Sequence, residues 1–153
     1  MPGTPLVLHP GTSVAPVTGE HAVMYVLTHR GSVACTLSGY PQVVLYNATG
    51  AAPPFRYARG GGADVISRKP VTVVLARGAS VHVLVAKYRC DPGIARTATT
   101  VQLTLHAAHS AAFTQREAAG ISGSAGLSYC RGGQHDPGQI VTVSPVELTT
   151  QAR

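Results

Sequence analysis

The chain has 153 residues, of which 44% are hydrophobic and 12% are charged, and it contains two Phe, six Tyr and no Trp. This length suits one domain that buries about 70% of its unfolded surface, and such a composition excludes an intrinsically disordered chain. Twelve Lys and Arg against six Asp and Glu give a formal net charge of +6, but the basic residues are scattered, so no nucleic-acid-binding tract is indicated.

The N-terminal segment, residues 1–20, is rich in Pro, Gly, Thr and Ser, with Leu6–Leu8 as its main apolar run. Proline lacks the backbone N–H that a central strand needs, so Pro10 and Pro16 predict a loose segment or an edge strand. Residues 21–29 then alternate in the two-residue period of a strand and predict the first long one.

The stretch from Cys35 to Asn47 is predicted to be the centre around which the other strands pack. Gly39 permits a turn, and Pro41 fixes the start of a strand that runs to Asn47. Between them, Tyr40 is suited to burying its ring while its hydroxyl finds a backbone partner, with ligand binding as the alternative. Asn47 opens a formal Asn-Ala-Thr glycosylation sequence, which we interpret as a turn.

Two alternating segments in the middle of the chain predict a hairpin. Residues 71–75 are β-branched, and residues 81–88 alternate strictly, with Ala76–Ala79 as a tight connection.

Residues 99–107 alternate again, and residues 139–148 form the last predicted strand, in which Pro145 indicates a sheet edge. Residues 111–119 are suited to one or two helical turns, because the glycines that follow oppose a long helix.

Short strands at roughly 8–15-residue spacing without a long helix predict an all-β fold. The expected architecture is an antiparallel β-sandwich of about seven strands with little helix, and a flattened barrel is the alternative. We expect the sandwich over residues 21–148, after the segment 1–20 and before a tail at 149–153. The sequence holds neither an internal repeat nor a linker between two domains.

Several motifs resemble a known family. They are the run Cys35-Thr-Leu-Ser-Gly-Tyr-Pro41, the run Val71–Ser80, and the late Cys90 and Cys130 before Val143-Ser-Pro-Val146. Over roughly residues 20–148 the chain resembles the actinobacterial family called domain of unknown function 4232. The resemblance implies an exported protein, often lipid-anchored or associated with the cell wall, with an immunoglobulin-like β-sandwich. No activity is established for that family.

Export bears on how the N-terminus is interpreted. Residues 1–4, Met-Pro-Gly-Thr, lack the charged and apolar regions of a signal peptide, and no lipobox cysteine is present. We therefore expect the sequence to be the mature part of a secreted or envelope-associated protein. Any membrane anchoring would go through a segment that this sequence does not contain. No run of about 18 apolar residues predicts a spanning helix.

Export also places the cysteines in an oxidising compartment, where disulfides persist. Cys90 and Cys130 are the predicted disulfide, which would close a loop of about 41 residues and stabilise the fold by roughly 4 kcal/mol. Cys35 would then be a buried, inert thiol. The cysteine count alone allows three single bridges.

No catalytic motif is recognisable, so we expect a protein that is not an enzyme. Ser122 lacks the glycine two places later that a nucleophile elbow requires, and Gly60–Gly62 is not followed by the lysine of a phosphate-binding loop. His106 and His109 have no cysteine or carboxylate near them in sequence, so neither a metal nor another cofactor is predicted.

The expected function is that of an exported, non-enzymatic binding module of the cell envelope, since a rigid sandwich presents variable loops. We place the interaction in the loops 53–68 and 131–139, because aromatic residues and arginine are enriched at interaction hot spots. The predicted binding residues are Phe55, Arg56, Tyr57 and Arg59. The partner is expected to be a protein or an envelope polymer and not a nucleic acid. A carrier of a small ligand or metal is the alternative.

Overall fold

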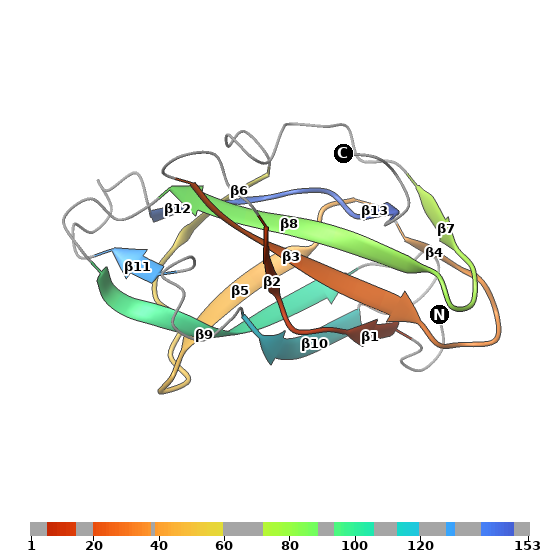
Figure 1. Ribbon diagram of the computed structural model, residues 1–153, viewed down its shortest axis with the longest axis horizontal. Coiled ribbons are helices and arrows are strands. Elements are labelled where there is room, and N and C mark those ends of the chain that lie inside the picture. Colours follow the sequence, from red (N-terminus) through yellow and green to blue (C-terminus); the bar gives the residue numbers. More distant parts are fainter. Residues whose placement is uncertain are drawn as a thin grey trace.

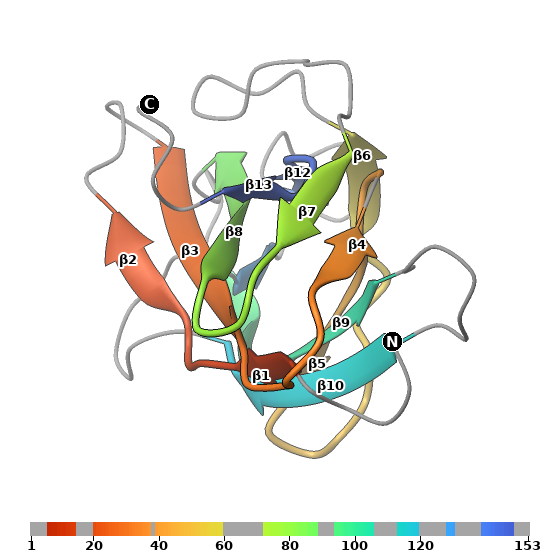
Figure 2. The same ribbon diagram turned by 90° about the vertical axis from the view of Figure 1, so that its right-hand side faces the viewer.

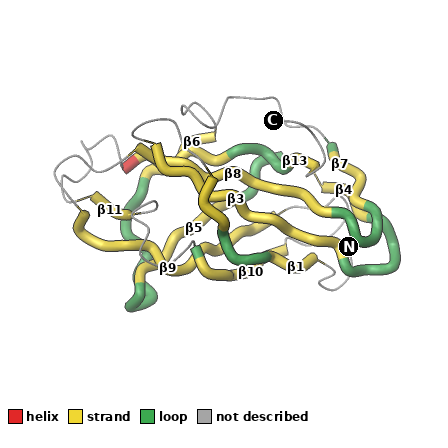
Figure 3. Tube along the Cα trace, in the orientation of Figure 1, coloured by secondary structure: helices red, strands yellow, loops and turns green. Residues whose placement is uncertain are grey.

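The computed structural model describes residues 6–14, 20–37, 39–59, 72–88, 94–105, 113–119, 128–130 and 139–148. They form 13 strands in sheets of seven, four and two strands (Figure 1). The two larger sheets face each other as the layers of a β-sandwich (Figure 2). Strands and their connecting loops make up almost all of the described trace (Figure 3). The predicted all-β sandwich is confirmed. The strand number exceeds about seven because short strands of two to four residues line its edges.

The seven-stranded sheet is centred on β3 (Glu20–His29) and β8 (Ser80–Tyr88), which are antiparallel from Glu20 opposite Tyr88 to Thr28 opposite Ser80. The N-terminal strands β1 and β2 pair with β3, and β12 and β13 pair with β8. Beyond β12, the edge strand β6 pairs with it in parallel. These five strands are β1 (Leu6–Leu8), β2 (Thr12–Val14), β6 (Arg56–Arg59), β12 (Ile140–Val143) and β13 (Glu147–Leu148).

The four-stranded sheet is built around the long strand β9 (Ile94–Leu105). The strands β5 (Gln42–Asn47) and β10 (Phe113–Ala118) pair with the same part of β9, so they lie on opposite edges of it. The short strand β11 (Ser128–Cys130) pairs with the beginning of β9. The remaining two-stranded sheet joins β4 (Cys35–Leu37) to β7 (Val73–Leu75).

The predicted hairpin between residues 71–75 and 81–88 is wrong. Its tight turn is present, with Ala79 N–H donating to the Ala76 carbonyl at 3.0 Å and Gly78 at a φ of +81°. However, β7 pairs with β4, while β8 pairs with β3 on one edge and with β12 and β13 on the other. Because both edges of β8 are occupied, β7 has to pair elsewhere.

Two further segments differ from their predictions. Residues 113–118 form β10 instead of helical turns, because pairing with β9 overrides their weak local preference. The last predicted strand, residues 139–148, is divided into β12 and β13 at Ser144. The Ser144 N–H donates to the Leu84 carbonyl at 2.9 Å, as in a regular ladder. The Leu84 N–H, however, donates to the side-chain Oγ of Ser144 at 2.8 Å.

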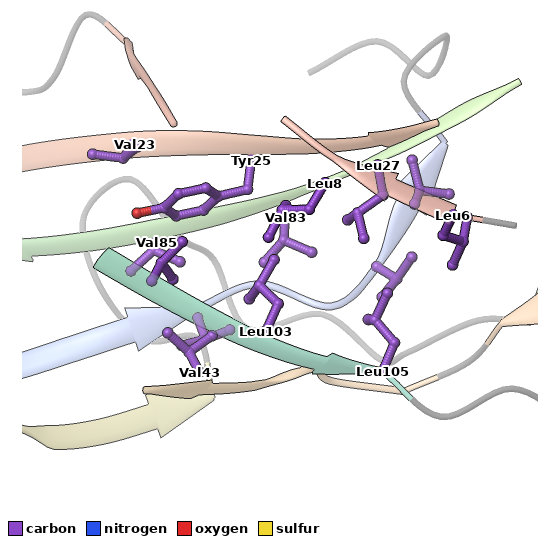
Figure 4. Packing of buried hydrophobic residues seen from close by; sticks show 14 of the residues in the cluster. Leu6, Leu8, Val23, Tyr25, Leu27, Val43, Val83, Val85, Leu103 and Leu105 are labelled. Carbon is purple, nitrogen blue, oxygen red and sulfur yellow. The ribbon is translucent and has the colours of Figure 1, made fainter. Parts of the chain in front are cut away.

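The core lies between the two larger sheets, where alternate side chains of each strand point inward (Figure 4). Tyr25, Leu27 and Val83 from the seven-stranded sheet and Leu103 from the four-stranded sheet have no exposed surface. In the described part of the chain, no helix is long and apolar enough to cross a membrane.

Candidate functional site

A cleft of about 500 Å³ lies between β5 at the edge of the smaller sheet and β6 at the edge of the larger one. It is lined by Tyr40–Val44, Tyr57–Arg59 and Val143. Pockets that hold small ligands span about 300–1,000 Å³, so the cleft has a suitable size. Among the described lining residues there is no carboxylate, histidine, cysteine or serine, so the side chains that usually act as nucleophile or general base are missing there.

The turn before β5 places the aromatic wall of the cleft. Gly39 has a φ of +86°, which favours glycine, and its carbonyl accepts the Val146 N–H at 3.2 Å. This hydrogen bond ties the turn to the segment between β12 and β13. Pro41 follows with its fixed φ and leads directly into β5. Tyr40 is thereby held half-buried two residues before the start of β5.

The other wall is β6, which the sequence had placed in the loop 53–68. Residues 56–59 of that loop form a strand because they pair in parallel with β12. Tyr57 reaches from β6 across to β5, where its hydroxyl accepts the Leu45 N–H at 3.0 Å. In the described structure, the Tyr57 side chain therefore joins β5 and β6 where no backbone ladder does.

Arg59 and Tyr40 form a cation–π pair across the cleft, with the guanidinium carbon 5.3 Å from the ring centroid. The stacked guanidinium is exposed, and its N–H groups lie in its own plane, where a carboxylate or phosphate is bound in the bidentate manner. The pair thus offers a positive charge beside an aromatic surface.

Tyr57 is a neutral group in this arrangement. Burial of its hydroxyl raises the pKa of Tyr57 above the ordinary value, and the Leu45 N–H that it accepts works against that rise. The hydroxyl is therefore protonated at neutral pH and retains a hydrogen that it can donate.

The four predicted binding residues have different positions. Tyr57 and Arg59 line the cleft, with Tyr57 41% exposed. Arg56 is exposed on the same strand but does not line the cleft. Phe55 is only 7% exposed and belongs to the hydrophobic core. Its ring centroid lies 6.3 Å from that of Tyr57, so Phe55 packs near Tyr57 from within the core.

Tyr40 is the site residue that the sequence had assigned mainly to packing. Its position between Gly39 and Pro41 was the available signal, since a turn that fixes the backbone also fixes its ring. Its partner Arg59 lies on another strand, so the pairing could not be read from local sequence.

Several other predicted positions lie outside the described residues. They include Cys90, His106, His109, Ser122, the run Gly60–Gly62 and the loop residues 131–138. Cys130 lies in β11, where its backbone pairs with Ile94. The predicted disulfide between Cys90 and Cys130 is therefore untested. In the described ranges, no three His, Cys, Asp or Glu residues gather as metal ligands would.

Cys35 is a free thiol that is 5% exposed and packs in the core. Burial raises the pKa of this thiol, which disfavours the thiolate. Such a group is a poor nucleophile.

Asn47 of the formal glycosylation sequence is 7% exposed and closes a turn. Its Oδ1 accepts the Thr49 N–H at 3.0 Å and the Ala51 N–H at 3.1 Å. The side chain therefore stabilises the turn that the sequence predicts at this position.

In comparisons with curated proteins and with solved structures, nothing matched the chain. A protein-family model matched residues 6–147, which include the N-terminal strands as well as both walls of the cleft. This protein thus belongs to the family described as Domain of unknown function (DUF4232).

Proposed function

We propose that this protein is an exported, non-enzymatic binding module of the actinobacterial cell envelope, and that the cleft between β5 and β6 receives its ligand. The observation that carries the proposal is the Arg59 guanidinium stacked on Tyr40 at the edge of a cleft of about 500 Å³. Arginine and tyrosine are the residues that recur at binding hot spots. The absence of nucleophile and base side chains from the described lining favours binding over catalysis.

The proposed extracytoplasmic location would allow a disulfide between Cys90 and Cys130 to form. Cys130 pairs with Ile94, and Cys90 precedes Ile94 by only about four residues, a reach of at most roughly 14 Å. A disulfide between Cys90 and Cys130 is compatible with this register and would persist only in an oxidising compartment. The third cysteine, Cys35, is buried, which protects it from exchange with such a bridge.

The charge of the chain bears on the kind of partner. A net charge of +6 and the exposed Arg59 favour an anionic ligand, such as an acidic protein segment or an anionic envelope polymer. The alternative is a carrier of a small anionic molecule, which the same cleft would accommodate by its volume.

The proposal is tested by co-sedimentation of the protein with actinobacterial envelope fractions at low and high salt. Arg59→Glu is compared with Arg56→Glu, which makes the same change of charge on the same strand outside the cleft. We expect wild-type binding that persists at high salt, is lost in Arg59→Glu and is retained in Arg56→Glu. Equal losses in the two variants, or binding that disappears with salt, would reduce the interaction to a non-specific attraction.

A further inference from the structure

The edge of β5 that faces the cleft has a defined set of backbone groups. In an antiparallel pair, both backbone groups of a residue point either toward the partner strand or away from it, and the direction alternates along the strand. Leu45 N–H donates to the Tyr57 hydroxyl, so Leu45 points away from β9. The register from Gln42 to Tyr46 is regular, so Val43, two residues earlier, also directs its N–H and C=O toward the cleft.

This edge therefore presents the Val43 N–H and C=O, because the Leu45 N–H already donates to Tyr57 and the Asn47 N–H donates to the Ala51 carbonyl. The Leu45 carbonyl lies one two-residue period further along the strand, about 6.8 Å away. Among the described residues, β5 pairs with β9 alone, and Val43 lines the cleft. A residue whose N–H and C=O both point outward can exchange a pair of hydrogen bonds with another extended chain, which is how peptides are added to exposed sheet edges.

The charge beside this edge selects the chemistry of such a chain. Arg59 stands across the cleft from β5 and is exposed, while no described lining residue carries a negative charge. A carboxylate on the added chain would meet the guanidinium, and an uncharged or basic side chain would not.

We infer that β5 takes an extended acidic peptide as an added strand, with its backbone paired to Val43 and a carboxylate beside the Arg59 guanidinium. This inference rests on the proposed function, since it names the class of ligand for the same cleft. It commits to a protein segment as the partner, and an anionic polymer is an outcome of the test.

The first measurement is amide hydrogen exchange of the free protein. We expect the Val43 amide to exchange at least about 100-fold faster than that of Val44, which points to β9. The comparison is then repeated at several protein concentrations. Slow exchange of Val43 that depends on protein concentration would mean that a second copy occupies the edge, and would overturn the inference.

The second measurement uses a displayed library of random heptapeptides selected on the wild-type protein. We expect the selected peptides to be rich in Asp, Glu and β-branched residues and to protect the Val43 amide. Their affinity should fall about 10- to 100-fold for Arg59→Gln, as for a lost hydrogen bond to a charged group, and change less than about twofold for Arg56→Gln. N-methylation of alternate peptide residues should abolish binding in one register and spare it in the other.

The outcomes separate the two proposals. Peptides that require Arg59 but leave Val43 unprotected would overturn strand addition and leave the cleft as a binding site. A library without Arg59-dependent peptides, combined with Arg59-dependent envelope binding, would exclude a peptide and assign the cleft to an anionic polymer. Urea unfolding of both Gln variants controls for folding, because each changes an exposed side chain.

Discussion

The two margins of the sandwich are each bridged by a tyrosine, with opposite results. At the closed margin, where β1 and β3 meet β10 and the residue that follows it, Tyr25 is fully buried and donates to the Ala119 carbonyl. At the open margin, where β6 meets β5, Tyr57 is 41% exposed and accepts a backbone N–H of β5. The same side chain therefore seals one margin and spans a cleft at the other.

The difference lies in what surrounds each ring. Beside Tyr25, Leu8 N–H donates to Gln115 Oε1 at 2.8 Å and links the sheets a second time. Gly11 is buried there, and a Cβ at this position would lie 2.6 Å from Cε1 of Tyr25. The close packing therefore requires a residue without a side chain. Beside Tyr57, the half-buried Tyr40 and the exposed Arg59 replace this apolar packing. A margin built from close packing contributes stability, whereas one built around a charged, open cleft is suited to binding.

The comparison is tested most strongly by Gly11→Ala. The added Cβ would lie 2.5 Å from the Ala119 carbonyl oxygen and 2.6 Å from both Tyr25 and Val23, so the closed margin has to move apart. We expect the free energy of unfolding in urea to fall by about 3 kcal/mol, at the upper end for overpacking.

The control for this variant is Gly50→Ala, in a turn where a Cβ would meet nothing within 4 Å but φ is +85°. Only the left-handed backbone penalty applies there, which is about 1 kcal/mol. Equal losses for the two variants would show that the closed margin is no tighter than an open turn.

Removing the two tyrosine hydroxyls measures the margins separately. Tyr25→Phe leaves the buried Ala119 carbonyl without the hydroxyl donor, and we expect a loss of about 2 kcal/mol in urea unfolding. Tyr57→Phe removes an acceptor at the exposed cleft, where water replaces it, so its cost should stay below about 0.5 kcal/mol. A larger loss for Tyr57→Phe would mean that the open margin carries the stability.

Alkaline pH is expected to lower the free energy of unfolding of the protein. Burial raises the pKa values of the Cys35 thiol and, together with the effect of Tyr57, of the Tyr25 hydroxyl. In the unfolded chain these groups lose their protons above about pH 8.5 and pH 10, while the folded protein keeps them. The unfolded state then binds fewer protons, so this stability is complete below pH 8.5 and declines as pH rises, by at most about 1.4 kcal/mol per pH unit for each group.

The measurement is urea unfolding from pH 7 to pH 10.5. Cys35→Ala should remove the decline that begins near pH 8.5, and Tyr25→Phe should reduce the part above pH 10, to which Tyr57 also contributes because its pKa is raised as well. Stability that stays level across this range in the wild-type protein would contradict the burial of both groups.

Local patterns predicted individual strands well. Residues 21–29 and 81–88 alternate in the sequence and form β3 and β8 almost to the residue. The Gly39 and Gly78 turns were also recognisable, since both require a positive φ. These features depend on neighbours in sequence.

Pairing between strands was beyond the local patterns. The segment Pro-Pro-Phe-Arg-Tyr-Ala-Arg, residues 53–59, has the composition of a loop, and β6 forms there only because β12 from near the end of the chain lies beside it. In the same way, β7 closely precedes β8 in sequence yet pairs with β4.

By itself, the sequence determined the all-β class, most of the strand positions and the family, because the two-residue alternation and the motifs are properties of single segments. The tertiary structure alone decided which edges face each other, and therefore that Tyr40 and Arg59 meet across a cleft. The physical reason is that backbone hydrogen bonds are chemically alike in every strand. The choice of partner depends on how the whole set of side chains packs, and no short stretch of sequence contains that information.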